Sequence, residues 1–120
     1  MDIESLRDYC ISKKGVTEDF PFGDDTLVFK VNSKIFALVN LEGEPGINLK
    51  CDPALALELR EQYPSVTPGY HMNKKHWNTV SLDGTIADSV VKDMIDHSFN
   101  LVAGVKKETI HKNNIKRNVI

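Results

Sequence analysis

Hydrophobic residues recur every three or four positions in three segments of the chain, a spacing that is typical of amphipathic helices. The first segment, residues 2 to about 14, begins at Asp2, which can cap the first turn, and ends at Gly15. The second begins at Asp52-Pro53 and runs to about Tyr63. Its start signal is strong, because aspartate caps a helix and proline fits the first turn.

The third helical segment is the longest. It is predicted to start at Thr85 or a neighbour, with Asp88 three positions on completing a partial capping box. Its apolar stripe is interpreted as core and comprises Val91, Met94, Ile95, Ser98, Leu101, Val102 and Val105. Residues 1–105 are therefore predicted to form a single domain. Residues 106–120 are polar and basic and are predicted to be a tail, either a frayed helical end or a disordered arm.

Short apolar runs between these segments predict strands. Leu27 to Val31 and Ile35 to Val39 predict a hairpin, because Asn32-Ser33 between them can form a two-residue turn. Further strands are predicted from Ile47 to Lys50 and from His76 or Trp77 to Leu82. The order helix, strand meander, helix, strand, helix predicts an α+β fold in which helices pack on one side of an antiparallel sheet.

Length and composition fit one globular domain. The chain has 120 residues, of which 41% are hydrophobic and 27% charged, and this is enough to bury a core. The net charge of −2 argues against binding to polyanions through the overall field, so nucleic-acid binding would need a local basic patch. Cys10 and Cys51 are interpreted as reduced thiols, because no signal peptide follows Met1, and a cytoplasmic location is expected. No apolar run reaches the roughly 18 residues that a membrane helix needs, so no membrane partner is expected.

The most distinctive chemistry lies in residues 70–80, which read Tyr-His-Met-Asn-Lys-Lys-His-Trp-Asn-Thr-Val and follow Pro68-Gly69. This composition predicts a polar, basic and aromatic loop that leads into a strand. Lysine and histidine can meet phosphates, asparagine can pair with base edges, and tyrosine can stack on a base. The candidate nucleic-acid-binding residues are Lys30, Lys34, Lys50, Tyr70, His71, Asn73, Lys74, Lys75, His76 and Asn78.

The same features also have structural interpretations. Two adjacent lysines in a loop are typical of a solvated turn. Trp77 is interpreted as a core anchor, because a large aromatic ring at the start of a strand usually buries its surface. Phe20 and Phe22 in the predicted loop of residues 16–25 either pack that loop onto the core or form the lip of a ligand site.

The sequence offers no recognisable catalytic or metal-binding motif. His71 and His76 are five positions apart, and Cys51 belongs to no paired-thiol motif, so a zinc site is not predicted. No serine sits in a nucleophile elbow and no glycine-rich loop opens a helix. Neither enzymatic activity nor a cofactor is therefore predicted.

Several blocks of the sequence together form a recognisable pattern. They are Phe20-Pro21-Phe22-Gly23, Leu27-Val28-Phe29-Lys30-Val31, Lys34-Ile35-Phe36-Ala37-Leu38, Asn48-Leu49-Lys50-Cys51-Asp52-Pro53, the stretch from Pro68 to Val80, and Asp96-His97-Ser98-Phe99-Asn100-Leu101-Val102. These blocks resemble the MmcQ/YjbR family of small bacterial proteins, occur in the same order as in the family and cover most of residues 1 to about 105. Ser33 and Phe99 stand where the family commonly has glycine and tyrosine.

This resemblance implies an α+β domain of the frataxin-like (CyaY-like) type. It also implies the function usually assigned to the family, DNA binding or regulation through a double-wing arrangement. The basic tail beyond Lys106 favours the same partner. The sequence does not set the oligomeric state, and a monomer is taken as the default.

Two other functions stay open. One is a protein- or small-ligand-binding module without catalysis, lined by Tyr70, His71, Trp77 and the Phe20–Phe22 loop. The other is an iron site by analogy with the frataxin-like fold, although Arg7, Lys13 and Lys14 interrupt its acids. The acidic residues for that site are Asp2, Glu4, Asp8, Glu18 and Asp19.

Overall fold

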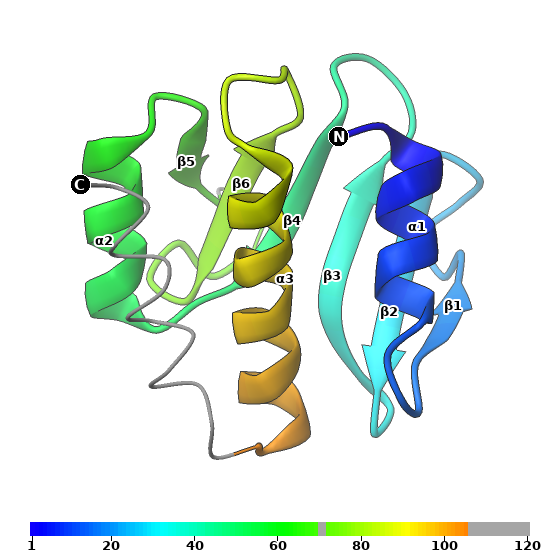
Figure 1. Cartoon of the computed structure of the whole chain (residues 1–120). Coiled ribbons are helices and arrows are strands. Elements are labelled where there is room, and N and C mark those ends of the chain that lie inside the picture. The colour runs from blue at the N-terminus through cyan, green and yellow to red at the C-terminus, as the bar shows by residue number, and fades with distance from the viewer. Residues whose placement is uncertain (70–71, 106–120) are drawn as a thin grey trace.

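In the part of the chain that the structure describes, six antiparallel strands form one sheet, and three helices cover one of its faces (Figure 1). The computed structural model describes residues 1–69 and 72–105. The strands lie side by side in the order β1-β2-β3-β4-β6-β5. In chain order the elements are α1 (Ile3–Ile11), β1 (Thr17–Asp19), β2 (Thr26–Val31), β3 (Lys34–Asn40), β4 (Gly46–Lys50), α2 (Pro53–Gln62), β5 (Val66–Pro68), β6 (Trp77–Ser81) and α3 (Asp88–Ala103). The predicted α+β class, with helices on one side of an antiparallel sheet, is confirmed.

The first two helices begin where their cap residues predict. The carboxylate of Asp2 accepts a hydrogen bond from the backbone N–H of Ser5 at 2.7 Å, and Asp52 accepts one from Leu55 at 3.2 Å. Each cap stabilises its helix by about 1 kcal/mol, because it satisfies a backbone donor that would otherwise lack a partner. α1 ends at Ile11, three residues earlier than predicted.

The start of α3 differs from the prediction. Thr85 does not cap the helix, because its backbone N–H and its hydroxyl both donate to Asp83 Oδ1, at 2.9 and 2.6 Å. The first residue of α3 is Asp88, and within the described residues no side chain forms a capping hydrogen bond at this end of the helix. The helix ends at Ala103, and the next residue, Gly104, has a left-handed φ of 77°. Its buried face includes His97 and Asn100, whereas the predicted core residue Val105 is exposed.

The β2–β3 hairpin has the predicted two-residue turn. Asn32 and Ser33 both have positive φ, 52° and 64°, which matches the type I′ turn that suits the twist of a hairpin. Two short strands were not predicted, namely β1 within the expected loop of residues 16–25 and β5 before the 70–80 stretch. Each is three residues long and lies at an edge of the sheet, too short for a periodic signal.

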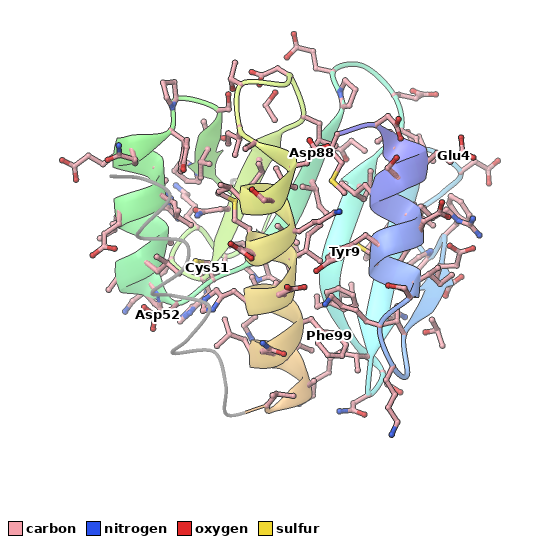
Figure 2. The ribbon with its side chains drawn as sticks, in the orientation of Figure 1. Glu4, Tyr9, Cys51, Asp52, Asp88 and Phe99 are labelled. Carbon is pink, nitrogen blue, oxygen red and sulfur yellow. The ribbon has the colours of Figure 1, made fainter. Side chains whose placement is uncertain are left out.

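The core lies between the sheet and the helices, and α3 crosses β3 and β4 at its centre (Figure 1). Tyr9 extends from α1 toward α3 (Figure 2), and its hydroxyl donates to Asp96 Oδ1 at 2.6 Å. Lys13 forms an ion pair with the same carboxylate. Burial is the main reason that the pKa of Tyr9 is raised, and the bond to Asp96 adds to it. These contacts fasten α1 to α3.

The two cysteines belong to this core. Cys10 and Cys51 are both buried, and no disulfide joins them. Burial raises the pKa of the Cys10 thiol to about 12, so this thiol stays protonated near neutral pH. Within residues 1–69 and 72–105, none of the helices combines the length and the apolar character that a membrane span requires.

Candidate nucleic-acid interface

Among the described residues, no helix lies on the second face of the sheet (Figure 1), and we call this face the open face. Side chains alternate between the two faces of a strand. Leu27, Phe29 and Val31 belong to the core between sheet and helices, so their neighbours on β2 point the other way. Cross-strand partners share a face, and the pairing extends this assignment across the sheet. The open face of the four central strands comprises Thr26, Val28, Lys30, Ile35, Leu38, Asn40, Asn48, Lys50, Trp77, Thr79 and Ser81.

Two of the candidate lysines, Lys30 and Lys50, lie together on the open face. Lys30 pairs with Ile35 on β3, and Lys50 pairs with Trp77 on β6. Only β3 lies between their strands, so their backbones are about 10 Å apart, two inter-strand spacings. Neither ammonium group has a carboxylate within salt-bridge distance in the part of the chain that the structure describes. Both can therefore meet an external anion.

Two other candidate residues lie elsewhere. Lys34 is exposed at the tip of the hairpin, and it pairs with Val31, whose side chain faces the helices. Asn78 is only 2% exposed, because it shares the inward face of β6 with Val80. Its Oδ1 accepts a hydrogen bond from Arg60 Nε at 2.7 Å. The prediction that Asn78 contacts a base edge is therefore wrong.

The loop of residues 72–76 is held by its own hydrogen bonds. Asn73 Oδ1 accepts from the backbone N–H of Lys75 at 2.9 Å, and the carbonyl of Asn73 accepts from the N–H of His76 at 3.1 Å. The oxygen of the Asn73 side chain thus shapes the turn. Lys74 and Lys75 are exposed and His76 is half-buried. Two further candidates, Tyr70 and His71, lie outside the described residues.

Arg60 anchors this loop from the helical layer. Besides Asn78, its guanidinium donates to the backbone carbonyls of Lys74 and, at 3.3 Å, of Trp77. These contacts join α2 to β6 and to the loop in front of it. Sequence patterns gave no sign of this role, because the partners follow Arg60 by 14 to 18 residues.

Trp77 is not the core anchor that its position predicted. It is half-buried on the open face, outside the core cluster. Gly69 packs against it so closely that an added Cβ would lie 2.9 Å from Trp77 Cβ. A residue with a side chain would collide there, so glycine is required for the approach of β5 to β6.

The open face also contains a groove with a volume of about 370 Å³. Ile35 and Leu38 lie on the strands, and Phe22 and Met72 come from the loops before β2 and β6. Phe20 and Phe22 are 46% and 63% exposed, so they do not pack their loop into the core. Phe22 instead lines the groove, which is the position that the alternative interpretation, the lip of a ligand site, requires. The groove is lined by Phe22, Thr26, Ile35, Leu38, Asn40, Asn48 and Met72.

The acidic residues considered for iron have other roles. Asp2 caps α1, and the Ser5 hydrogen bonds of that cap lower its pKa. Glu18 accepts two hydrogen bonds from Arg7, at 2.8 and 2.5 Å. This hydrogen bonding raises the pKa of the Arg7 guanidinium. Among the residues described, no three His, Cys, Asp or Glu side chains converge to hold a metal ion.

Comparisons with known proteins find relatives that match most of the chain. The protein-family model YjbR matches residues 11–101. The uncharacterized protein YjbR of Escherichia coli strain K12 is 35% identical over 113 residues, which cover 93% of this chain and 96% of that protein. The uncharacterized protein YbdF of Escherichia coli O157:H7 is 49% identical over 84 residues, 69% of each chain.

Solved structures with the same fold are also close in sequence. The crystal structure of DR2400 from Deinococcus radiodurans, described as a DUF419 domain, has a TM-score of 0.81 and 37% identity over 95% of this chain and 87% of that one. A crystal structure of a Pseudomonas syringae protein has a TM-score of 0.76 and 32% identity over 85% of this chain and 99% of that one. With the family model covering most of the sheet and helices, the chain belongs to the YjbR family.

Proposed function

We propose that the open face of the sheet binds DNA, with Lys30 and Lys50 contacting phosphates on either side of β3. The observation that carries this proposal is the position of the two lysines. They share the face without helices, and neither forms a salt bridge with a carboxylate of the described chain. Such cations pair with phosphate oxygens and release the counterions that surround the nucleic acid.

The loop of residues 72–76 adds to the same surface. It begins at Met72 in the groove of the open face and carries the exposed residues Lys74 and Lys75. A local basic region of this kind is compatible with a net charge of −2 for the whole chain. The proposed role is binding or regulation without catalysis.

A salt titration tests the proposal. Fluorescence anisotropy of labelled DNA should show binding in low-salt buffer that weakens steeply as salt rises. The double variant Lys30→Gln/Lys50→Gln should lower the slope of log K against log salt by about 2, one for each phosphate contact removed. The proposal fails if no DNA binds in low salt, or if the double variant binds with an unchanged slope.

The groove favours a second candidate function, the binding of a small ligand. Its volume of about 370 Å³ and its apolar walls of Phe22, Ile35, Leu38 and Met72 are typical of small-molecule sites. A thermal-shift screen with metabolites should then find a compound that raises the melting temperature of the native chain and not of Phe22→Ala. If no compound raises the melting temperature, the result contradicts small-ligand binding in the groove.

A further inference from the structure

The groove of the open face combines apolar walls with two carboxamides. Phe22 and Met72 rise from loops on its rim, and Ile35 and Leu38 form its floor. Asn40 and Asn48 line it from the neighbouring strands β3 and β4. A nucleobase has the complementary chemistry, because its flat faces are apolar and its edges carry hydrogen-bond donors and acceptors.

The carboxamide of Asn48 has a fixed orientation. Its Oδ1 accepts a hydrogen bond from the hydroxyl of Thr79 at 2.6 Å, and its Nδ2, for which the described residues supply no partner, can donate two hydrogen bonds. Asn40 is exposed and can turn either its oxygen or its nitrogen toward a ligand. The groove therefore offers both donors and an acceptor next to its apolar walls.

The shape of the open face suits single-stranded nucleic acid better than a duplex. Bases in a duplex are stacked and paired, and proteins reach their edges with a helix or a two-stranded ribbon placed in a groove. In residues 1–69 and 72–105 all three helices lie on the opposite face of the sheet (Figure 1). An open sheet with half-buried apolar and aromatic side chains, beside the exposed ring of Phe22, instead suits unstacked bases, as in other sheet platforms that bind single strands.

We infer that the nucleic acid bound by the open face is single-stranded, with one unstacked base in the groove against Phe22 and Met72. This inference rests on the proposed function, because Lys30 supplies the charge beside the groove. Lys30 is the cross-strand partner of the groove residue Ile35, so a phosphate bound to Lys30 lies next to a base seated in the groove. Lys50 can take another phosphate of the same strand.

The test compares a labelled single strand with the duplex of the same sequence, in the same buffer and with the native full chain. We expect the single strand to bind at least about fivefold more tightly than the duplex, the lower end of what one stacked base contributes. Phe22→Ala should weaken binding of the single strand by a similar factor and leave duplex binding unchanged. The matched control is Leu57→Ala, because Leu57 on α2 is also 63% exposed but lies in the helical layer. It should leave both affinities unchanged.

Each outcome decides a different question. Equal or tighter binding of the duplex would overturn the single-strand inference while leaving the proposed DNA binding intact. Unchanged single-strand binding by Phe22→Ala would overturn the role of the groove. A mononucleotide that binds in the groove when the single strand does not would support the groove as a base site but overturn the single-strand inference. If neither the strand nor the duplex binds in low salt, the proposed function itself fails.

Discussion

The hydroxyl of Ser98 accepts a hydrogen bond from the backbone N–H of Lys50 at 2.9 Å. It also donates to the carbonyl of Phe36 at 2.5 Å. The pairing of β3 with β4 ends at Ala37 and Leu49, so the hydroxyl bridges the next residue on each strand. A side chain of α3 thus continues the sheet beyond its last direct pair and fixes the backbone that carries Lys50.

This bridge predicts that Ser98→Ala destabilises the protein. The substitution leaves the N–H of Lys50 and the carbonyl of Phe36 without their partner in the interior, which costs about 1–3 kcal/mol of unfolding free energy. Urea denaturation measures the loss. Ser89→Ala is the matched control, because Ser89 is exposed on the same helix. Equal stability of the two variants would contradict the bridging role.

The register of the hairpin predicts that substitutions of two nearby lysines weaken DNA binding to different extents. Lys30 points to the open face, whereas Lys34 pairs with a core-facing residue at the hairpin tip. Lys30→Glu should therefore weaken DNA binding more than Lys34→Glu, although both variants change the net charge by the same amount. Anisotropy titrations of both variants in one buffer test this. Equal losses would mean that DNA responds to overall charge and not to the open face.

The contacts of Arg60 predict that this residue orders the loop of residues 72–76. Arg60→Ala removes the partner of the buried Asn78 and releases the carbonyl of Lys74, and we expect a loss of about 1–3 kcal/mol in stability. Trypsin should also cleave faster after Lys74 or Lys75. Arg7→Ala is the control, because its ion pair with Glu18 is partly exposed and such pairs contribute about 0–1 kcal/mol. Unchanged cleavage in Arg60→Ala would contradict the anchoring role.

The turn before α3 predicts a pH dependence. Hydrogen bonds from Thr85 and Ser65 lower the pKa of Asp83 from 3.8 to about 2. A carboxyl whose pKa is lower in the folded state stabilises it above the unfolded pKa and loses this effect as the pH falls through the folded value. The difference in melting temperature between the native chain and Asp83→Asn should thus be constant near neutral pH and shrink between about pH 4 and pH 2. A difference that does not change over this range would contradict the assignment.

Local interactions explain which parts of the fold were predictable. The caps at Asp2 and Asp52 and the turn at Asn32-Ser33 depend on residues within three positions, so their signals are in the sequence. Thr85 misled the prediction of α3 because Asp83, two residues earlier, competes for its hydrogen bonds.

The orientation of the side chains on β6 shows how a site prediction can fail when the inward and outward positions of a strand are exchanged. An aromatic residue was expected inside and an amide outside, yet Trp77 faces out and Asn78 faces in. The aliphatic Val80 is the signal that could have settled this, because a period of two forces Asn78 onto the face of Val80. Arg60, which donates a hydrogen bond to the buried amide of Asn78, comes from α2. No pattern within β6 could therefore reveal it.

The most direct test of the open face is an NMR titration of the full chain with a single-stranded oligonucleotide. Trp77 is the only tryptophan, so its indole N–H gives one resonance that reports on this face. We predict shifts of that resonance and of the amides of Lys30 and Lys50, with none at Leu57 on α2. Shifts confined to the helices, or unchanged resonances on the open face at saturating oligonucleotide, would contradict the account.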